Sequence, residues 1–115
     1  MSSILFQLRD HVALITLNRP DKFNSFYQEM ALQLQEYLDA CKKDEVRAVY
    51  ITGAGRAFSA GQDISELVGE QKIEIKQILA EHYNPIITRI RKLEKPVVAA
   101  VNGVAAGAGA NIALC

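Results

Sequence analysis

The chain has 115 residues, of which 50% are hydrophobic and 23% are charged. A disordered chain lacks that much apolar surface, so the composition predicts one soluble globular domain with a single core. The 13 basic residues balance the 13 acidic ones, and without a net charge or a basic run nucleic acid is not an expected partner.

The N-terminal region predicts a β-hairpin. Residues 4–9 alternate apolar with mixed side chains, and residues 12–17 are apolar at nearly every position. Asp10 and His11 lie between the two runs and are typical of a turn. We therefore expect an edge strand that pairs with a strand buried on both faces.

A helix is expected after residues 18–22, which break the strand pattern. Ser25 and Gln28 have the spacing of a capping box, in which the two side chains satisfy backbone N–H groups at a helix start. Apolar residues then recur at helical spacing, which indicates one face packed on a sheet. These residues are Phe26, Met30, Leu34, Leu38 and Cys41.

The middle of the chain predicts an α/β architecture. The β-branched run at residues 46–52 follows the helix, and a strand, helix and strand in this order form a right-handed crossover with parallel strands. Asp63 and Glu66 predict a second capping box, and helical spacing extends over residues 73–93. Pro85 lies inside that helix and predicts a kink, because its ring removes a hydrogen-bond donor.

At the C-terminal side, residues 97–101 predict a buried parallel strand, and the glycine-rich residues 102–109 predict a turn into another helix. That helix reaches Cys115 without a capping signal. We therefore expect residues 1–115 to form one truncated domain that lacks its C-terminal part.

The uncharged residues 97–115 are nearly long enough for a membrane span. They contain few of the large apolar residues that favour insertion, so a strand, a turn and a helix of small residues explain them better, and no membrane association is expected. The N-terminus has no signal-peptide pattern, and Cys41 and Cys115 show no CxxC spacing. These features indicate a cytoplasmic protein with reduced thiols.

Two glycine-bearing loops, residues 53–64 and 102–109, each follow a predicted parallel strand. Ligands bind at the carboxyl ends of such strands, and backbone N–H groups at the following helix starts favour negative charge. Two such loops that face one cleft would form an oxyanion site. The alternative is that small residues merely allow close packing of strand and helix. Neither loop completes a nucleotide-binding fingerprint.

Several ordered motifs resemble the crotonase (enoyl-CoA hydratase/isomerase) family. Residues 58–64 read FSAGQDI and are similar to the family pattern F-C/A/S-A-G-x-D-L/I. Residues 101–110 read VNGVAAGAGA and are similar to V-N-G-x-A-x-G-G/A-G. Residues 17–20, 24–26 and 29–30 also follow the family's opening pattern. The resemblance covers essentially the whole chain and implies the N-terminal part of the crotonase superhelix of repeated strand, strand and helix units.

The resemblance implies an acyl-CoA substrate whose thioester oxygen is held by two backbone N–H groups while an enolate forms at Cα. By position these donors are the amides of Gln62 and Ala108. The residues that the resemblance assigns to CoA binding are Lys22, Phe23, Ala60, Gly61, Asp63 and Ile64. An ordinary solvated lysine is the alternative for Lys22, and Asp63 is expected to be a helix N-cap rather than a catalytic acid.

The chain departs from the hydratases of the family at Asn111, where the resemblance implies a glutamate that activates water. An amide cannot take up a proton, so hydration by paired carboxylates is disfavoured. The motifs resemble most the phenylacetate-pathway branch, which implies isomerisation of a phenylacetyl-CoA epoxide to an oxepin-CoA, or a double-bond shift. The acid/base residue of that branch would lie beyond Cys115.

The alternatives are an enoyl-CoA hydratase, and a truncated chain that is inactive and at most binds CoA weakly. His11 and His82 lie far from both loops in the predicted order of elements, so neither is expected to act as a base. No metal is expected, because the His and Cys residues lack ligand spacing. No cofactor is expected besides the CoA of the substrate. The resemblance implies a homotrimer or hexamer for the full-length protein.

Overall fold

The computed structural model describes residues 2–115, and its strands form two sheets. The larger sheet has the order β1-β2-β3-β5, in which β1 is antiparallel to β2 and the other neighbours are parallel. Its strands are β1 (Ile4–Arg9), β2 (Val12–Leu17), β3 (Ala48–Gly53) and β5 (Val97–Ala100). The smaller, parallel sheet joins β4 (Ala57–Ser59) to β6 (Val104–Ala105). The predicted hairpin and parallel sheet are confirmed.

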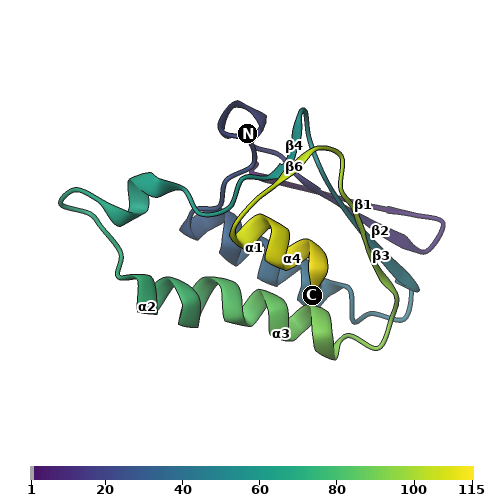
Figure 1. Ribbon diagram of the computed structural model, residues 1–115. Helices are drawn as coiled ribbons and strands as arrows, with labels where there is room; N and C mark the ends of the chain where they lie inside the picture. The colour runs from purple at the N-terminus through teal and green to yellow at the C-terminus, as the bar shows by residue number, and fades with distance from the viewer. Residues whose placement is uncertain (1) are drawn as a thin grey trace.

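The helices lie mainly beside and below the larger sheet in the view of Figure 1. They are α1 (Gln28–Ala40), α2 (Ile75–Ile78), α3 (Asn84–Lys92) and α4 (Ala108–Leu114), with short 3₁₀ turns η1 (Pro20–Lys22) and η2 (Ile64–Leu67). A π-helical segment, η3 (Leu79–Tyr83), joins α2 to α3. None of the helices formed by residues 2–115 combines the length and apolar character needed to cross a bilayer.

One face of the larger sheet is buried against helices. Ala13, Ile15 and Leu17 of β2 point into the core, where Met30 and Leu34 of α1 are also fully buried. Burial of such side chains contributes about 1.5–3 kcal/mol each, so this layer is a main source of stability. The helical stripe predicted for residues 26–41 is the one that faces this core.

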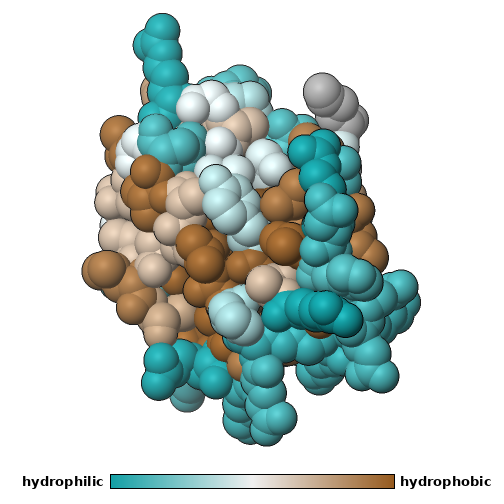
Figure 2. Space-filling model, turned by 90° about the vertical axis from the view of Figure 1, so that its right-hand side faces the viewer, coloured by the Kyte–Doolittle hydropathy of each residue, from teal (hydrophilic) through white to brown (hydrophobic). Residues whose placement is uncertain are grey.

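The other face of the larger sheet is not buried by residues 2–115. Tyr50 of β3 is 39% exposed and Val98 of β5 is 52% exposed, and Leu14 of β2 is half-buried. Figure 2 shows hydrophobic residues gathered on the right-hand side of the molecule as drawn in Figure 1, with hydrophilic residues around them. The prediction that the strands at residues 12–17 and 97–101 are buried on both faces is therefore wrong, because the helices formed by residues 2–115 cover only one face.

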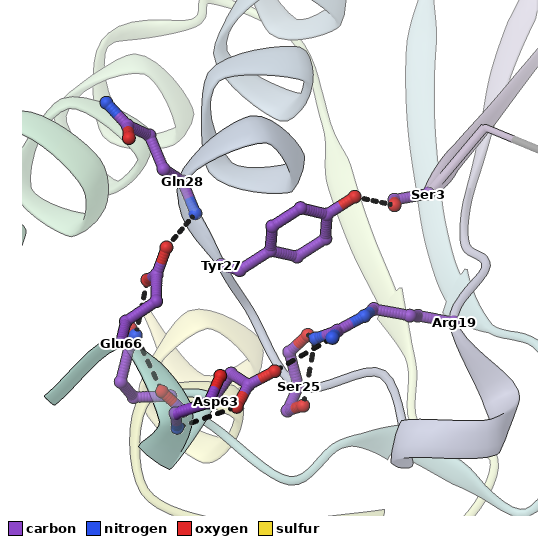
Figure 3. Close-up of polar contacts among 9 residues, drawn as sticks. Ser3, Arg19, Ser25, Tyr27, Gln28, Asp63 and Glu66 are labelled. Carbon is purple, nitrogen blue, oxygen red and sulfur yellow. Dashed lines mark hydrogen bonds and ion pairs between the residues drawn. The ribbon is translucent and has the colours of Figure 1, made fainter. Parts of the chain in front are cut away.

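Helix α1 starts differently from the prediction. Its first residue is Gln28 and its N-cap is Tyr27, whose side chain makes no capping bond. The Ser25 hydroxyl instead lies 3.2 Å from a guanidinium nitrogen of Arg19. The backbone N–H of Gln28 donates to the Glu66 carboxylate at 2.8 Å, so the cap comes from η2, 38 residues away (Figure 3). A local capping box is thus replaced by a tertiary one.

The long helix agrees more closely with its prediction. Helical backbone runs without interruption from Ile75 to Lys92, within the expected residues 73–93. The sequence predicts a kink at Pro85, and the structure has the π-helical segment η3, which ends two residues before the proline. Proline removes one N–H from the helical ladder, and insertion of a π turn is one way in which a helix adapts to that loss.

Candidate functional site

The two glycine-bearing loops lie side by side. Strands β4 and β6 pair in parallel, and the N–H of Ala106 donates to the carbonyl of Ser59 at 3.0 Å. A Cβ added at Gly109 would lie 2.1 Å from the Ser59 oxygen, so only glycine allows this approach. The small residues therefore allow close packing of strand and helix, as the alternative interpretation of the loops predicts. They also bring the two loops next to each other.

Two asparagines, the buried Asn24 and the exposed Asn102, hold the first loop. Asn24 is fully buried and donates to the carbonyls of Ala54 and Ala57 at 3.0 and 2.8 Å. Asn102 accepts from the N–H of Gly53 at 3.0 Å and donates to the carbonyls of Gly55 and Ala57 at 3.1 Å each. These amides satisfy backbone groups that a loop would otherwise leave without partners.

Phe26 orients the backbone around Gln62. The N–H of Phe26 donates to the Gly61 carbonyl at 2.7 Å, and its carbonyl accepts from the N–H of Asp63 at 2.8 Å. Successive peptide groups of an extended strand point in opposite directions, so the N–H of Gln62 points away from Phe26. The local backbone therefore leaves the Gln62 N–H on the side of this segment that faces away from Phe26.

The second loop presents the N–H of Ala108, the first residue of α4. Gly61 has φ of +103°, and a Cβ added there would lie 3.3 Å from the Ala108 nitrogen, which shows how closely the loops approach. Within residues 2–115, neither the Gln62 nor the Ala108 N–H donates a hydrogen bond. An N–H without an internal acceptor can bind a ligand oxygen.

Both residues line one apolar pocket with a volume of about 440 Å³. Its other lining residues are Leu67, Ile75, Ile78, Leu79, Tyr83, Asn84, Ile87, Gly107, Asn111 and Ile112. Apolar walls with a few convergent polar groups are typical of small-molecule sites. The predicted position of Asn111 at the site is thus matched by its place in the pocket wall.

The side chain of Gln62 forms hydrogen bonds at both ends. Its Oε1 accepts from the Tyr83 hydroxyl at 2.5 Å, and its Nε2 donates to Glu66 at 2.7 Å. Burial, and secondarily the charge of Glu66, raise the pKa of Tyr83, so the phenol is a donor at neutral pH. Sequence reasoning missed Tyr83 and Glu66 here, because neither belongs to a glycine loop.

Asp63 is the N-cap of η2, as the sequence predicts. Its carboxylate accepts from the N–H of Ser65 at 2.9 Å and forms an ion pair with Arg19 at 2.8 Å (Figure 3). Burial opposes ionisation of Asp63, but the hydrogen bonds from Ser65 and Arg19 outweigh it, and its pKa lies below the usual range. The guanidinium of Arg19 also stacks 4.4 Å from the Tyr27 ring centroid. Half of the predicted capping box is wrong, because Glu66 turns to Gln28 and Gln62 instead.

The sequence profile of the enoyl-CoA hydratase/isomerase family matches residues 7–115. The chain belongs to this family. The resemblance to crotonases inferred from the two loops is therefore confirmed, and so is the mixed α/β fold. The profile match covers both loops, the pocket and the long helix.

Known crotonase-family proteins are similar to the chain over nearly all of its length. It is 44% identical to the 1,2-epoxyphenylacetyl-CoA isomerase of Escherichia coli K12, with 99% of the chain and 45% of the relative covered. It is 37% identical to the short-chain-enoyl-CoA hydratase of Clostridium acetobutylicum, covering 99% and 44%. A crystal structure of an enoyl-CoA hydratase from Mycobacterium avium subsp. paratuberculosis matches with a TM-score of 0.86 and 36% identity, covering 99% and 44%. The chain thus spans slightly less than half the length of these relatives.

The residues predicted to bind CoA lie in or beside the first glycine-bearing loop, residues 53–64. The N–H of Ala60 donates to the Phe23 carbonyl at 2.9 Å, which brings the turn at residues 22–23 against the first loop. Phe23 is 52% exposed and Ile64 is 71% exposed, so both present apolar surface to solvent. Lys22 is exposed as well, whereas Asp63 is held by Arg19. Their binding of CoA remains a prediction.

The two histidines lie outside the apolar pocket that Gln62 and Ala108 line. His11 is in the hairpin turn, with Nδ1 3.0 Å from the Glu45 carbonyl oxygen. His82 is buried in η3, and neither of its ring nitrogens has a hydrogen-bond partner among residues 2–115. Neither side chain lines the pocket, and the expectation that neither acts as a base stays a prediction.

Proposed function

We propose that the chain binds the thioester oxygen of an acyl-CoA through the backbone N–H groups of Gln62 and Ala108, and so stabilises an enolate at Cα. The observation that carries the proposal is that both N–H groups lie on one pocket without an acceptor in residues 2–115. Preorganised donors aimed at developing charge contribute about 2.7–4 kcal/mol each. Family membership supports the same substrate class.

The proposed reaction is an isomerisation, either of a phenylacetyl-CoA epoxide or of an enoyl-CoA double bond. Asn111 presents an amide to the pocket, and none of the described lining residues is a carboxylate. Activation of water by paired carboxylates therefore has no support in the described wall. The name of the E. coli relative favours the epoxide, whereas the Clostridium relative keeps hydration as the alternative.

For the rest of the substrate, we propose that CoA lies along the first loop. Gly61, Ala60 and Asp63 form the backbone edge of this loop, and Phe23 and Ile64 offer exposed apolar surface beside it. The exposed Lys22 would then meet a CoA phosphate. For the whole protein we propose a cytoplasmic homotrimer or hexamer, as the family resemblance implies, which light scattering would test.

A second proposed function is binding of acyl-CoA without turnover. An isomerase must move a proton, yet the described pocket wall contains no group that exchanges protons near neutral pH. Tyr83 is the one ionisable residue in that wall, and its pKa is raised by burial and then by Glu66. In this proposal the described residues polarise the substrate carbonyl, but none of those that line the pocket acts as a base near neutral pH.

Calorimetric titration with acetoacetyl-CoA tests the proposed donors. Ala108→Pro removes one N–H at the first position of α4, where proline is well tolerated. Since a hydrogen bond to a charged group contributes about 1.5–3 kcal/mol, we expect the Kd to rise roughly 10- to 150-fold. Ala108→Gly keeps the N–H and is the matched control, for which we expect nearly unchanged affinity. Equal Kd values for the two variants would contradict the proposal.

Proton exchange in deuterium oxide separates the two proposed functions. Incorporation of deuterium at Cα of a bound acyl-CoA would support the isomerase, because enolate formation requires that this proton leaves. Binding without exchange would support the non-catalytic function. Absence of binding by a folded chain would contradict both.

A further inference from the structure

The side chain of Gln62 links the pocket wall to the start of α1 through a continuous hydrogen-bonded chain. Tyr83, in the wall, donates to Gln62 Oε1 at 2.5 Å, and Gln62 Nε2 donates to Glu66 Oε1 at 2.7 Å. The other oxygen of Glu66 accepts from the N–H of Gln28 at 2.8 Å (Figure 3). This chain of bonds joins η3 to η2 through Gln62, and η2 to α1 through Glu66.

The two ends of this glutamine are chemically distinct. A phenol donates at one end and a carboxylate accepts at the other, so the amide has one favourable orientation. Glutamate at position 62 could not donate to Glu66, and a leucine or methionine could bond to neither partner. The raised pKa of Tyr83 keeps its donor proton in place at neutral pH.

We propose that Gln62 is a positioning residue, whose side chain holds its own backbone N–H in the direction of the pocket with Tyr83 and Glu66 as supports. The inference rests on the proposed function, in which that N–H binds the thioester oxygen. Phe26 anchors the loop backbone from one side only. The side-chain bonds supply the anchor on the other side.

A second anchor matters because of Gly61. This residue precedes Gln62, has φ of +103°, and lacks a side chain that could limit its backbone rotation. A donor that moves by about 1 Å can lower a rate by roughly 100-fold, so the backbone next to such a glycine needs support from neighbouring side chains. The Tyr83 and Glu66 bonds to Gln62 lie directly after Gly61 and provide that support.

Infrared spectroscopy of bound acetoacetyl-CoA, carbon-13 labelled at the thioester carbonyl, tests the inference on the full chain. Gln62→Met keeps the side-chain length and removes both bonds, and Tyr83→Phe removes only the phenol donor. Tyr37→Phe is the control, because it removes the same hydroxyl from a tyrosine outside the pocket that stacks on Phe6 at 4.8 Å.

For the unaltered chain we expect binding to lower the carbonyl stretching frequency, because hydrogen bonds polarise the C=O bond. Gln62→Met and Tyr83→Phe should lose most of this lowering while the Kd changes much less, and Tyr37→Phe should keep it. Full lowering in Gln62→Met and Tyr83→Phe would overturn the positioning role. No lowering in the unaltered chain would instead contradict the proposed function.

Backbone relaxation of nitrogen-15 decides the positioning role even without a ligand. We expect rigid order parameters of about 0.85 at residues 61–63 in the unaltered chain, and a fall toward 0.6 in Tyr83→Phe and Gln62→Met. Tyr37→Phe should leave these values unchanged. Equal order parameters in all four proteins would overturn the inference, whatever the infrared result.

Discussion

The side-chain amide of Gln35, in α1, makes the hydrogen bond that Pro85 cannot make in the long helix. A residue at position 85 would normally donate its N–H to the Glu81 carbonyl, four residues earlier, but proline has none. Gln35 Nε2 donates instead to the carbonyls of Glu81 and His82, at 2.8 and 3.1 Å. The π segment that carries Tyr83 into the pocket is thus held from a neighbouring helix.

Replacement of Gln35 should destabilise the chain. Gln35→Leu leaves the Glu81 carbonyl without its buried donor, which costs about 1–3 kcal/mol of the free energy of unfolding. Urea denaturation followed by circular dichroism measures this change. Gln77→Leu, at an exposed position of α2, is the control and should have little effect. A Gln35→Leu chain as stable as the control would contradict the assigned role.

The effects of Gln35→Leu and Pro85→Ala should not be additive. An alanine at position 85 has an N–H that can reach the Glu81 carbonyl, so loss of Gln35 should cost about 1 kcal/mol less in that background. A double-mutant cycle of unfolding free energies measures this coupling. Strict additivity would show that Gln35 and Pro85 act independently.

Asp63 should make stability depend on pH in the acidic range. Its folded pKa is lowered, so ionised Asp63 stabilises the chain above its unfolded pKa of about 3.9, and this contribution disappears as pH falls through the folded pKa. Asp63→Asn should therefore be less stable than the unaltered chain at pH 7 and nearly as stable at pH 2. Urea midpoints measured across this range check the trend. An Asp63→Asn chain as stable as the unaltered one at pH 7 would contradict this contribution.

Gly109 should respond oppositely to the usual helical rule, and Gly69, which lies outside the helices, provides the comparison. Gly109 lies inside α4, where alanine normally stabilises, but a Cβ there would lie 2.1 Å from the Ser59 oxygen. We expect Gly109→Ala to lower the unfolding free energy by roughly 3 kcal/mol. Gly69 has φ of +86° with nothing within 4 Å of an added Cβ, so Gly69→Ala should cost only about 1–2 kcal/mol. A Gly109→Ala chain more stable than Gly69→Ala would contradict the close packing of the loops.

His82 should tolerate an apolar replacement. The ring is 1% exposed, and neither nitrogen has a hydrogen-bond partner among residues 2–115. Removal of an unsatisfied buried polar group is neutral or stabilising, so His82→Leu should raise the unfolding free energy by about 1 kcal/mol. Thermal denaturation of both chains at pH 7 measures the difference in their free energies of unfolding. A clear loss of stability would indicate a partner for the imidazole, such as a buried water.

Residue patterns were sufficient wherever neighbours in sequence decide the structure. The hairpin pairs Ile4 with Leu17 and turns at Asp10 and His11, as alternation and turn chemistry predict. The positions of the two glycine-bearing loops could also be predicted from the sequence, because a site without room for a Cβ selects glycine. The strand predicted at residues 97–101 formed, but its burial was not predictable, since burial depends on what packs against it.

The sequence by itself determined the order of elements, the family and the two backbone donors proposed for the site, because each follows from short-range spacing or from motifs. Only the tertiary structure decided that Glu66 caps α1, that Gln35 compensates for Pro85, and that Tyr83 and Glu66 clamp the side chain of Gln62. Three of those bonds, Gln28–Glu66, Gln35–Glu81 and Tyr83–Gln62, join residues between 21 and 46 positions apart. Their partners are selected by three-dimensional proximity, for which local periodicity carries no signal.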